Sequence, residues 1–277
     1  MNRKATTIAL LLSVVFLATL GAGCQKLKAR DHLNKGVQAF KGAKYAEAIE
    51  NFKTAVELDP NYPVARLYLA MAYMNQYIPG AESEENQAMS KAAEENFLKV
   101  LEQEANNTVA LASLASLHYN QAQGVSDLEA KFKKLDEAKE WYQKLAVADP
   151  QNKEAFYSLG VIAWAKAYPV RGAARVKLGM KPEDPGPIKD KKVREELLAK
   201  NSALIEDGIK NLEKAIDIDK EYDDAMAYLN LLLRERADLQ ESPESYKKDV
   251  ELADNWVSKA LEVKKIKATR PATQQPG

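Results

Sequence analysis

The sequence predicts an all-α fold, a right-handed solenoid of about five helical hairpins, several of them with lengthened helices. The main observation is a helical pattern that spans residues 36–60 and returns at residues 135–150 and 205–219. Such self-similarity indicates a stack of small units rather than one globular core. The 12 glycines and 11 prolines are few for 277 residues, and most lie where a hairpin is expected to end. A stack of this kind presents a long surface, which favours a binding role.

The composition excludes several classes of protein. Lys and Arg number 40, and Asp and Glu also number 40, so the formal net charge is zero. A protein that binds nucleic acid with its whole surface needs a positive excess, so no nucleic-acid partner is expected. The chain has one cysteine and two histidines. It therefore cannot form an intrachain disulfide or a zinc site with the usual Cys/His spacing, and no cofactor is expected.

The first 24 residues have the pattern of a secretory signal. Arg3 and Lys4 make a basic start, residues 5–20 carry no charge, and small residues lead to Cys24. A basic start, a short apolar run and a small-residue exit are typical of an export signal. The apolar run is shorter than the roughly 20 residues that a membrane span needs.

The only cysteine lies where a lipid could be attached. Cys24 follows Gly21, Ala22 and Gly23, and this segment resembles a bacterial lipobox, although Gly21 stands where leucine is usual. The resemblance implies a lipid on Cys24 and a place in the bacterial cell envelope. Because Gln25 rather than aspartate follows the cysteine, it further implies the outer membrane, facing the periplasm. The alternatives are an ordinary cleaved signal and an uncleaved anchor with an incidental Cys24.

The expected hairpins share small residues in both helices and an aromatic or leucine side chain between them. In the first hairpin the landmarks are Gly36, Ala48, Phe52, Ala55 and Pro60. In the later hairpins the first two landmarks are Ala70 and Ala93, Ala115 and Ala138, Gly160 and Gly208, and Asn230 and Ala253. Small residues let the two helices approach closely, and a proline after the second helix stops it.

This set of landmarks resembles the tetratricopeptide repeat, a pair of antiparallel helices of about 34 residues. The resemblance covers residues 29–265. It implies a scaffold that holds partner peptides or helices in a concave groove lined by the first helix of each hairpin. We therefore expect a lipoprotein signal and attachment site at residues 1–24, a solenoid at 25–265 and a disordered tail at 266–277.

The second, third and fifth hairpins each contain eleven extra residues between their landmarks. Eleven residues make about three helical turns, so the simplest interpretation is that both helices of each pair are longer. Helix-forming residues at 84–92 and 128–134 favour this over a floppy loop.

The fourth hairpin has a longer insert, at about residues 165–202. We expect Pro169 to end its first helix, residues 180–187 to form a loop, and one helix to run from Ile188 to Asp219.

One position of the first helix gathers large apolar side chains. Four residues past the small landmark stand Phe40, Met74, Tyr119 and Trp164, which we call the first-helix ladder, while the fifth hairpin has Arg234 there. The ladder could receive a partner helix or extended peptide. The alternative is that these side chains fill the cores of the hairpins.

The insert in the fourth hairpin is basic. It holds ten lysines and arginines against five acidic residues, and the candidates for contact are Arg171, Arg175, Lys177, Lys181, Lys191, Lys192 and Arg194. The functional interpretation is a dock for an acidic partner, an anionic lipid or an anionic polymer. The alternative is a solvated insert that only caps the groove.

No pattern of an enzyme stands out. His32 and His118 lie at regular helix positions without a local motif, and Asp59, Asp149 and Asp219 are expected to be turn residues. The sequence therefore predicts a non-enzymatic scaffold that binds envelope proteins and is attached to the membrane through Cys24. The alternatives are a module that binds an anionic polymer or lipid through the basic insert, and an enzyme whose site is formed only in the folded structure.

Overall fold

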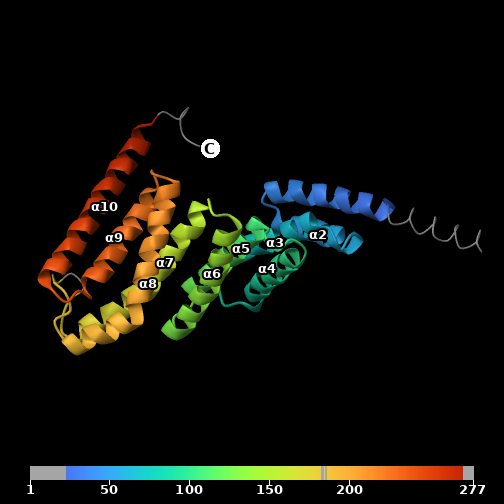
Figure 1. Ribbon diagram of the computed structural model, residues 1–277. Helices are drawn as coiled ribbons and strands as arrows, with labels where there is room; N and C mark the ends of the chain where they lie inside the picture. The colour runs from blue at the N-terminus through green and yellow to red at the C-terminus, as the bar shows by residue number, and fades with distance from the viewer. Residues whose placement is uncertain (1–22, 182–183, 185, 271–277) are drawn as a thin grey trace, which may run out of the picture. The chain divides into compact units, whose positions relative to one another are not determined.

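A computed structural model describes residues 23–181, 184 and 186–270 (Figure 1). The described residues form helices and loops without a strand, which confirms the predicted all-α class. The expected signal segment up to residue 22 and the last seven residues lie outside this range. None of the described helices is long and apolar enough to span a bilayer.

The chain divides into two compact units, Met1–Ser126 and Asp127–Gly277. The boundary falls between the two helices of the third expected hairpin. The sequence, read as one solenoid over residues 25–265, did not predict this division.

The first unit contains a helix over residues 23–41, followed by α2 (Tyr45–Leu58), α3 (Pro63–Gln76), α4 (Glu84–Gln103) and α5 (Thr108–Gln123). Consecutive helices from α2 to α5 pack on one another. A Cβ on Gly36 would lie 2.5 Å from the ring of Phe52, so the first helix and α2 approach as the landmarks predict. Ser83 and Asn107 accept hydrogen bonds from the first turns of α4 and α5, which fixes where these helices begin.

The second unit contains α6 (Leu128–Ala148), α7 (Lys153–Lys177), α8 (Lys191–Ile218), α9 (Asp223–Ala237) and α10 (Pro243–Thr269). A Cβ on Gly160 of α7 would lie 2.3 Å from Leu212 of α8, and one on Gly208 of α8 would lie 2.5 Å from Ala163 of α7. These two contacts run in opposite directions along the two helices, so α7 and α8 are antiparallel, as the fourth hairpin requires. The core of the unit lies between α7, α8 and α9, and α10 covers α9.

The extra residues of the second, third and fifth hairpins are helical, as predicted, but they lengthen only the second helix of each pair. The first helices α3, α5 and α9 have 14, 16 and 15 residues, whereas α4, α6 and α10 have 20, 21 and 27. Ile78 precedes Pro79, and a residue before proline disfavours the helical conformation, so α3 cannot extend. The prediction that both helices lengthen is therefore wrong.

The structure corrects two boundaries in the fourth hairpin. Helix α7 continues through Pro169 to Lys177 instead of ending there. Proline in a helix costs about 3 kcal/mol, but buried ion pairs of Arg171 and Arg175 hold the part that follows. Helix α8 begins at Lys191 rather than Ile188, because Asp190 accepts a hydrogen bond from the backbone N–H of Val193 and caps it.

The predicted disordered tail begins too early in the sequence. Helix α10 extends to Thr269. Lys267 pairs with Asp223 of α9, and the Arg270 guanidinium donates hydrogen bonds of 3.0 and 2.8 Å to Glu221. Polar contacts with the start of α9 and the loop before it therefore support residues 266–270, where apolar periodicity has been lost.

Candidate protein-binding surfaces

All four side chains of the first-helix ladder are half-buried. Phe40, Met74 and Tyr119 belong to the first unit and Trp164 to the second. The structure therefore describes three of these residues in one unit and one in the other.

Phe40 and Trp164 stand in aromatic clusters. The ring of Phe40 meets Tyr45 and Tyr68 edge to face, with centroids 5.4 and 6.2 Å apart. Trp164 stacks on Tyr168 at 5.1 Å and meets Tyr228 of α9 edge to face at 5.6 Å.

Such pairs fix the orientation of each ring while part of its surface stays accessible to solvent. Phe40 and Trp164 therefore pack against aromatic neighbours in their own units and are still partly accessible to solvent.

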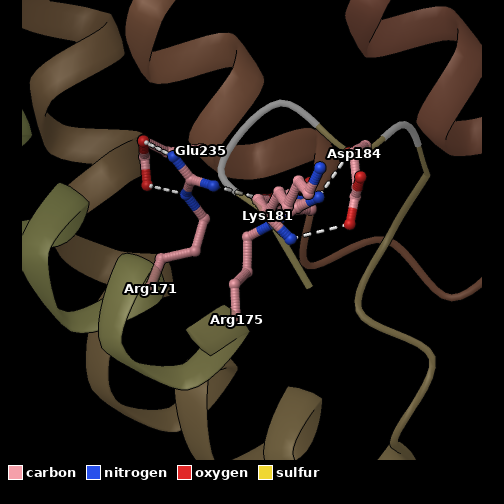
Figure 2. A network of polar contacts seen from close by, with 6 residues as sticks. Arg171, Arg175, Lys181, Asp184 and Glu235 are labelled. Carbon is pink, nitrogen blue, oxygen red and sulfur yellow. Dashed lines mark hydrogen bonds and ion pairs between the residues drawn. The ribbon is translucent and has the colours of Figure 1, made fainter. Parts of the chain in front are cut away.

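Two arginines of the basic insert take part in a buried ionic network, called the α7–α9 network below (Figure 2). The Arg171 guanidinium donates to both carboxylate oxygens of Glu235, at 2.6 and 2.9 Å, and to Asp238 at 2.8 Å. Arg175 donates to the same Asp238 oxygen at 2.6 Å. Arg171 is 9% exposed and Arg175 is 2% exposed. The prediction that these two arginines contact a partner is therefore wrong, because both charges are satisfied inside the protein.

The loop after α7 is held by the same network. Arg175 donates to the backbone carbonyl of Lys181 at 3.2 Å and also to that of Asp184, and the backbone N–H of Ile188 donates to the Asp238 carbonyl at 3.0 Å. Figure 2 shows Arg175 reaching toward Lys181 and Asp184. The insert is thus attached to the end of α9 by ionic groups.

Burial and charge pairing act in opposite directions in this network. Burial would lower the pKa of the Arg171 guanidinium, but its hydrogen bonds and charge pairing with Glu235 and Asp238 raise the pKa overall. Burial raises the pKa of the Glu235 carboxyl above its usual value, although Arg171 opposes this. Removing a partner from such a pair leaves an uncompensated buried charge, which is strongly destabilising. The network therefore holds the insert in place.

The remaining candidates in the insert are more accessible. Lys177, Lys181, Lys191 and Lys192 are exposed, and Lys191 lies 3.8 Å from Glu195. Arg194 is half-buried and donates to the backbone carbonyl of Ile188 at 2.9 Å. Of the seven basic residues predicted to contact a partner, the four that are exposed are all lysines.

Sequence reasoning missed both the α7–α9 network and an apolar cleft beside it. The signal for the network was present, because Arg171 and Arg175 are four residues apart and Glu235 and Asp238 are three apart. Residues at such spacings share one face of a helix, so two charged faces could have been paired.

The structure shows no metal-binding cluster among the described residues. His118 is buried, with its Nε2 atom 3.7 Å from a Glu94 oxygen. Asp59, Asp149 and Asp219 each stand at the end of a helix, and the backbone N–H groups of Gln151 and Glu221 donate to Asp149 and Asp219. These three aspartates are turn residues, as predicted.

One segment of the chain matches a known family model. Residues 40–76, which include α2 and α3, match the family model described as TPR repeat. No curated protein matches the chain in sequence.

Solved structures share the fold at low sequence identity. MamA 41-end from Desulfovibrio magneticus RS-1 is 17% identical, with a TM-score of 0.52, over 87% of this chain and 98% of that one. A MamA RS-1 double mutant gives 17% identity and a TM-score of 0.52 over 88% and 98%. A thermophilic TPR protein in Thermus thermophilus is 16% identical over 84% of this chain and 99% of that one, with a TM-score of 0.43.

Proposed function

We propose that this chain, a tetratricopeptide-repeat protein, is a membrane-anchored scaffold of the bacterial cell envelope that binds partner peptides or helices along its first helices. The observation that carries the proposal is the half-buried state of the first-helix ladder. The repeat fold supports a protein partner in general, because this kind of fold presents extended surfaces.

The geometry of the ladder suits an anchor point for a partner. Large aromatic residues that are fixed by neighbours bind with little loss of side-chain entropy, and such residues dominate the energy of many interfaces. Trp164, stacked on Tyr168, has this arrangement, and Phe40 has a similar one against Tyr45 and Tyr68. A partner helix or extended peptide would bury the remaining apolar surface.

The proposed anchor is a lipid on Cys24. Cys24 is exposed, and residues 23–41 form a helix, so an attached lipid would leave only a short distance between the bilayer and the first hairpin. More than one acyl chain holds a protein stably on a membrane without a transmembrane helix.

Anchoring is tested by the Cys24→Ser variant in the producing bacterium. We expect the wild-type chain to incorporate labelled fatty acid and to sediment with outer membranes, and the variant to do neither. Sedimentation of the unlabelled variant with membranes would indicate an uncleaved anchor and contradict lipidation.

Partner binding is tested by crosslinking the anchored protein in its own envelope and identifying the captured proteins. The Tyr119→Ala and Trp164→Ala variants are compared with wild type. If one partner dominates and these variants lose it, the ladder is the working surface. Capture that is unchanged in both variants would show that the ladder only fills the hairpin cores.

The exposed lysines of the insert favour a second candidate, binding of an anionic polymer or lipid. Lys177, Lys181, Lys191 and Lys192 supply positive charge, whereas Arg171 and Arg175 do not, because both are buried. Binding through the lysines would fall steeply as salt is raised, whereas binding in an apolar groove would not. A salt titration of binding to anionic vesicles distinguishes the two functions.

A further inference from the structure

An apolar cleft lies between the second half of α7 and the first half of α8. It has a volume of about 320 Å³ and is lined on α7 by Pro169, Val170, Ala173, Ala174 and Lys177, on α8 by Val193, Glu196, Leu197 and Lys200, and at one side by Leu128 of α6. Leu197 is buried at its floor, and Val170, Ala174 and Val193 pack partly against the same core. The cleft is thus an accessible edge of the core of the second unit.

The two walls of the cleft have the same spacing. On α7 the positions are 170, 173, 174 and 177, and on α8 they are 193, 196, 197 and 200. Both sets follow the i, i+3, i+4, i+7 rule, so each forms one stripe along its helix. Two such stripes on neighbouring antiparallel helices form a groove into which the side-chain ridge of a third helix fits.

The α7–α9 network lies on a different face of α7 from the cleft. Arg171 and Arg175 leave α7 on a different stripe and pair with Glu235 and Asp238, so α9 packs against another face of α7. Helix α7 therefore presents one face to α9 and leaves the face of the cleft to solvent.

The rim of the cleft carries a lysine near each end. The contacts of Gly160 with Leu212 and of Gly208 with Ala163 fix the antiparallel register, which places Lys177 near the loop and Lys200 near Pro169. This register sets Lys200 level with residues 171–172 of α7, so the two lysines stand about one and a half helical turns, or about 8 Å, apart along the axis. Both are exposed, and neither makes an ion pair with a described residue. Glu196 is the only acidic residue among the described residues that line the cleft.

We propose that the α7–α8 cleft is a docking site for an acidic amphipathic helix of a partner protein. Its apolar stripe packs between the two walls, and two carboxylates about four to seven residues apart on one face of that helix lie opposite Lys177 and Lys200. Charge complementarity selects this occupant, because the two lysines have no ion-pair partner in the described part of the chain and the floor is apolar. This site rests on the proposed function only in that the ligand is a protein, and it is separate from the first-helix ladder.

The test measures binding of three synthetic helical peptides to the full chain in nanodiscs of zwitterionic lipid, by fluorescence anisotropy. The first peptide has a leucine stripe flanked by two glutamates seven residues apart. The second replaces the glutamates with lysines, and the third replaces the leucines with alanines. Empty nanodiscs measure binding to the lipid.

The protein variants are Lys177→Glu with Lys200→Glu, and a matched control, Lys210→Glu with Lys248→Glu. The control lysines are exposed in the same unit, make no ion pair with a described residue and lie outside the cleft. Circular dichroism checks that each variant is folded.

We expect the first peptide to bind at least about tenfold more tightly than the other two. Charge reversal of the two cleft lysines should weaken binding of the first peptide by about tenfold and strengthen binding of the second. The control pair should change the affinity by less than about twofold.

Equal binding of the first and third peptides would indicate a purely electrostatic surface for polyanions and would overturn the proposal. An equal loss of affinity for the first peptide in the cleft variant and in the control variant would also overturn the proposal. Partner capture through the ladder is measured separately. Absence of peptide binding would contradict the docking site in the cleft but not the proposed function. Absence of partner capture would contradict the proposed function but not the docking site.

Discussion

The close packing of α7 on α8 predicts opposite effects for two alanine substitutions in one helix. A Cβ on Gly160 would lie 2.3 Å from Cγ of Leu212 and 2.6 and 2.8 Å from its two methyl carbons, and Leu212 is fully buried. A Cβ on Gly172 of the same helix would have no neighbour within 4 Å. Gly160→Ala therefore forces α7 and α8 apart, whereas Gly172→Ala does not.

The magnitudes follow from these contacts. Overpacking a core costs about 1–3 kcal/mol, and replacing glycine by alanine inside a helix gains about 1 kcal/mol. We expect Gly160→Ala to lower the free energy of unfolding by up to about 2 kcal/mol and Gly172→Ala to raise it by up to about 1 kcal/mol.

Urea unfolding followed by tryptophan fluorescence measures both variants. The three tryptophans, Trp141, Trp164 and Trp256, all belong to the second unit, so the signal reports the unit that is changed. This matters because two units can unfold separately, and a single transition for the whole chain cannot be assumed. A Gly160→Ala variant as stable as Gly172→Ala would refute the proposed register of α7 and α8.

Two further predictions concern ionic groups of the second unit. Arg171→Met leaves Glu235 buried without its partner, while Asp238 keeps Arg175, and should lower the free energy of unfolding by about 3–5 kcal/mol at neutral pH. Because burial raises the pKa of Glu235, part of this loss should be recovered as the pH falls and the carboxyl binds a proton; a loss that does not depend on pH would contradict this origin. Lys153 donates to Asp219 at 2.7 Å, and this hydrogen bond lowers the pKa of Asp219. Its stabilisation is therefore present above the usual aspartate pKa and is lost as the pH falls through the lowered value. Asp219→Asn should cost at most about 1 kcal/mol at pH 7 and nothing in strong acid, as thermal unfolding across pH would show; a cost that persists in acid would point to lost packing.

The repeat landmarks were predictable because they are local and steric. Gly36 with Phe52 and Gly160 with Leu212 form the close helix contacts that the pattern required. A small residue opposite a large one at a fixed spacing can be read from the sequence alone, since the helical period fixes which side chains face each other.

The insert was harder to predict because distant contacts override its local signals. Pro169 is a strong stop signal, yet α7 continues because Arg171 and Arg175 pair with acidic residues more than 60 positions away. The polar end of α10 is similarly held by Asp223 and Glu221. Local propensity cannot show such partners, so buried arginines were interpreted as a binding surface and a helix end as a disordered tail.

The proposed binding of partners along the first helices is tested most directly by site-specific photocrosslinking in the living cell. A photoreactive amino acid is placed in turn at Met74 and Trp164 of the ladder, and as a control at Val147, which is 81% exposed at the end of α6. We expect a crosslinked partner at one or both ladder positions and none at Val147. Crosslinks at Val147 without any at the ladder would contradict the proposal.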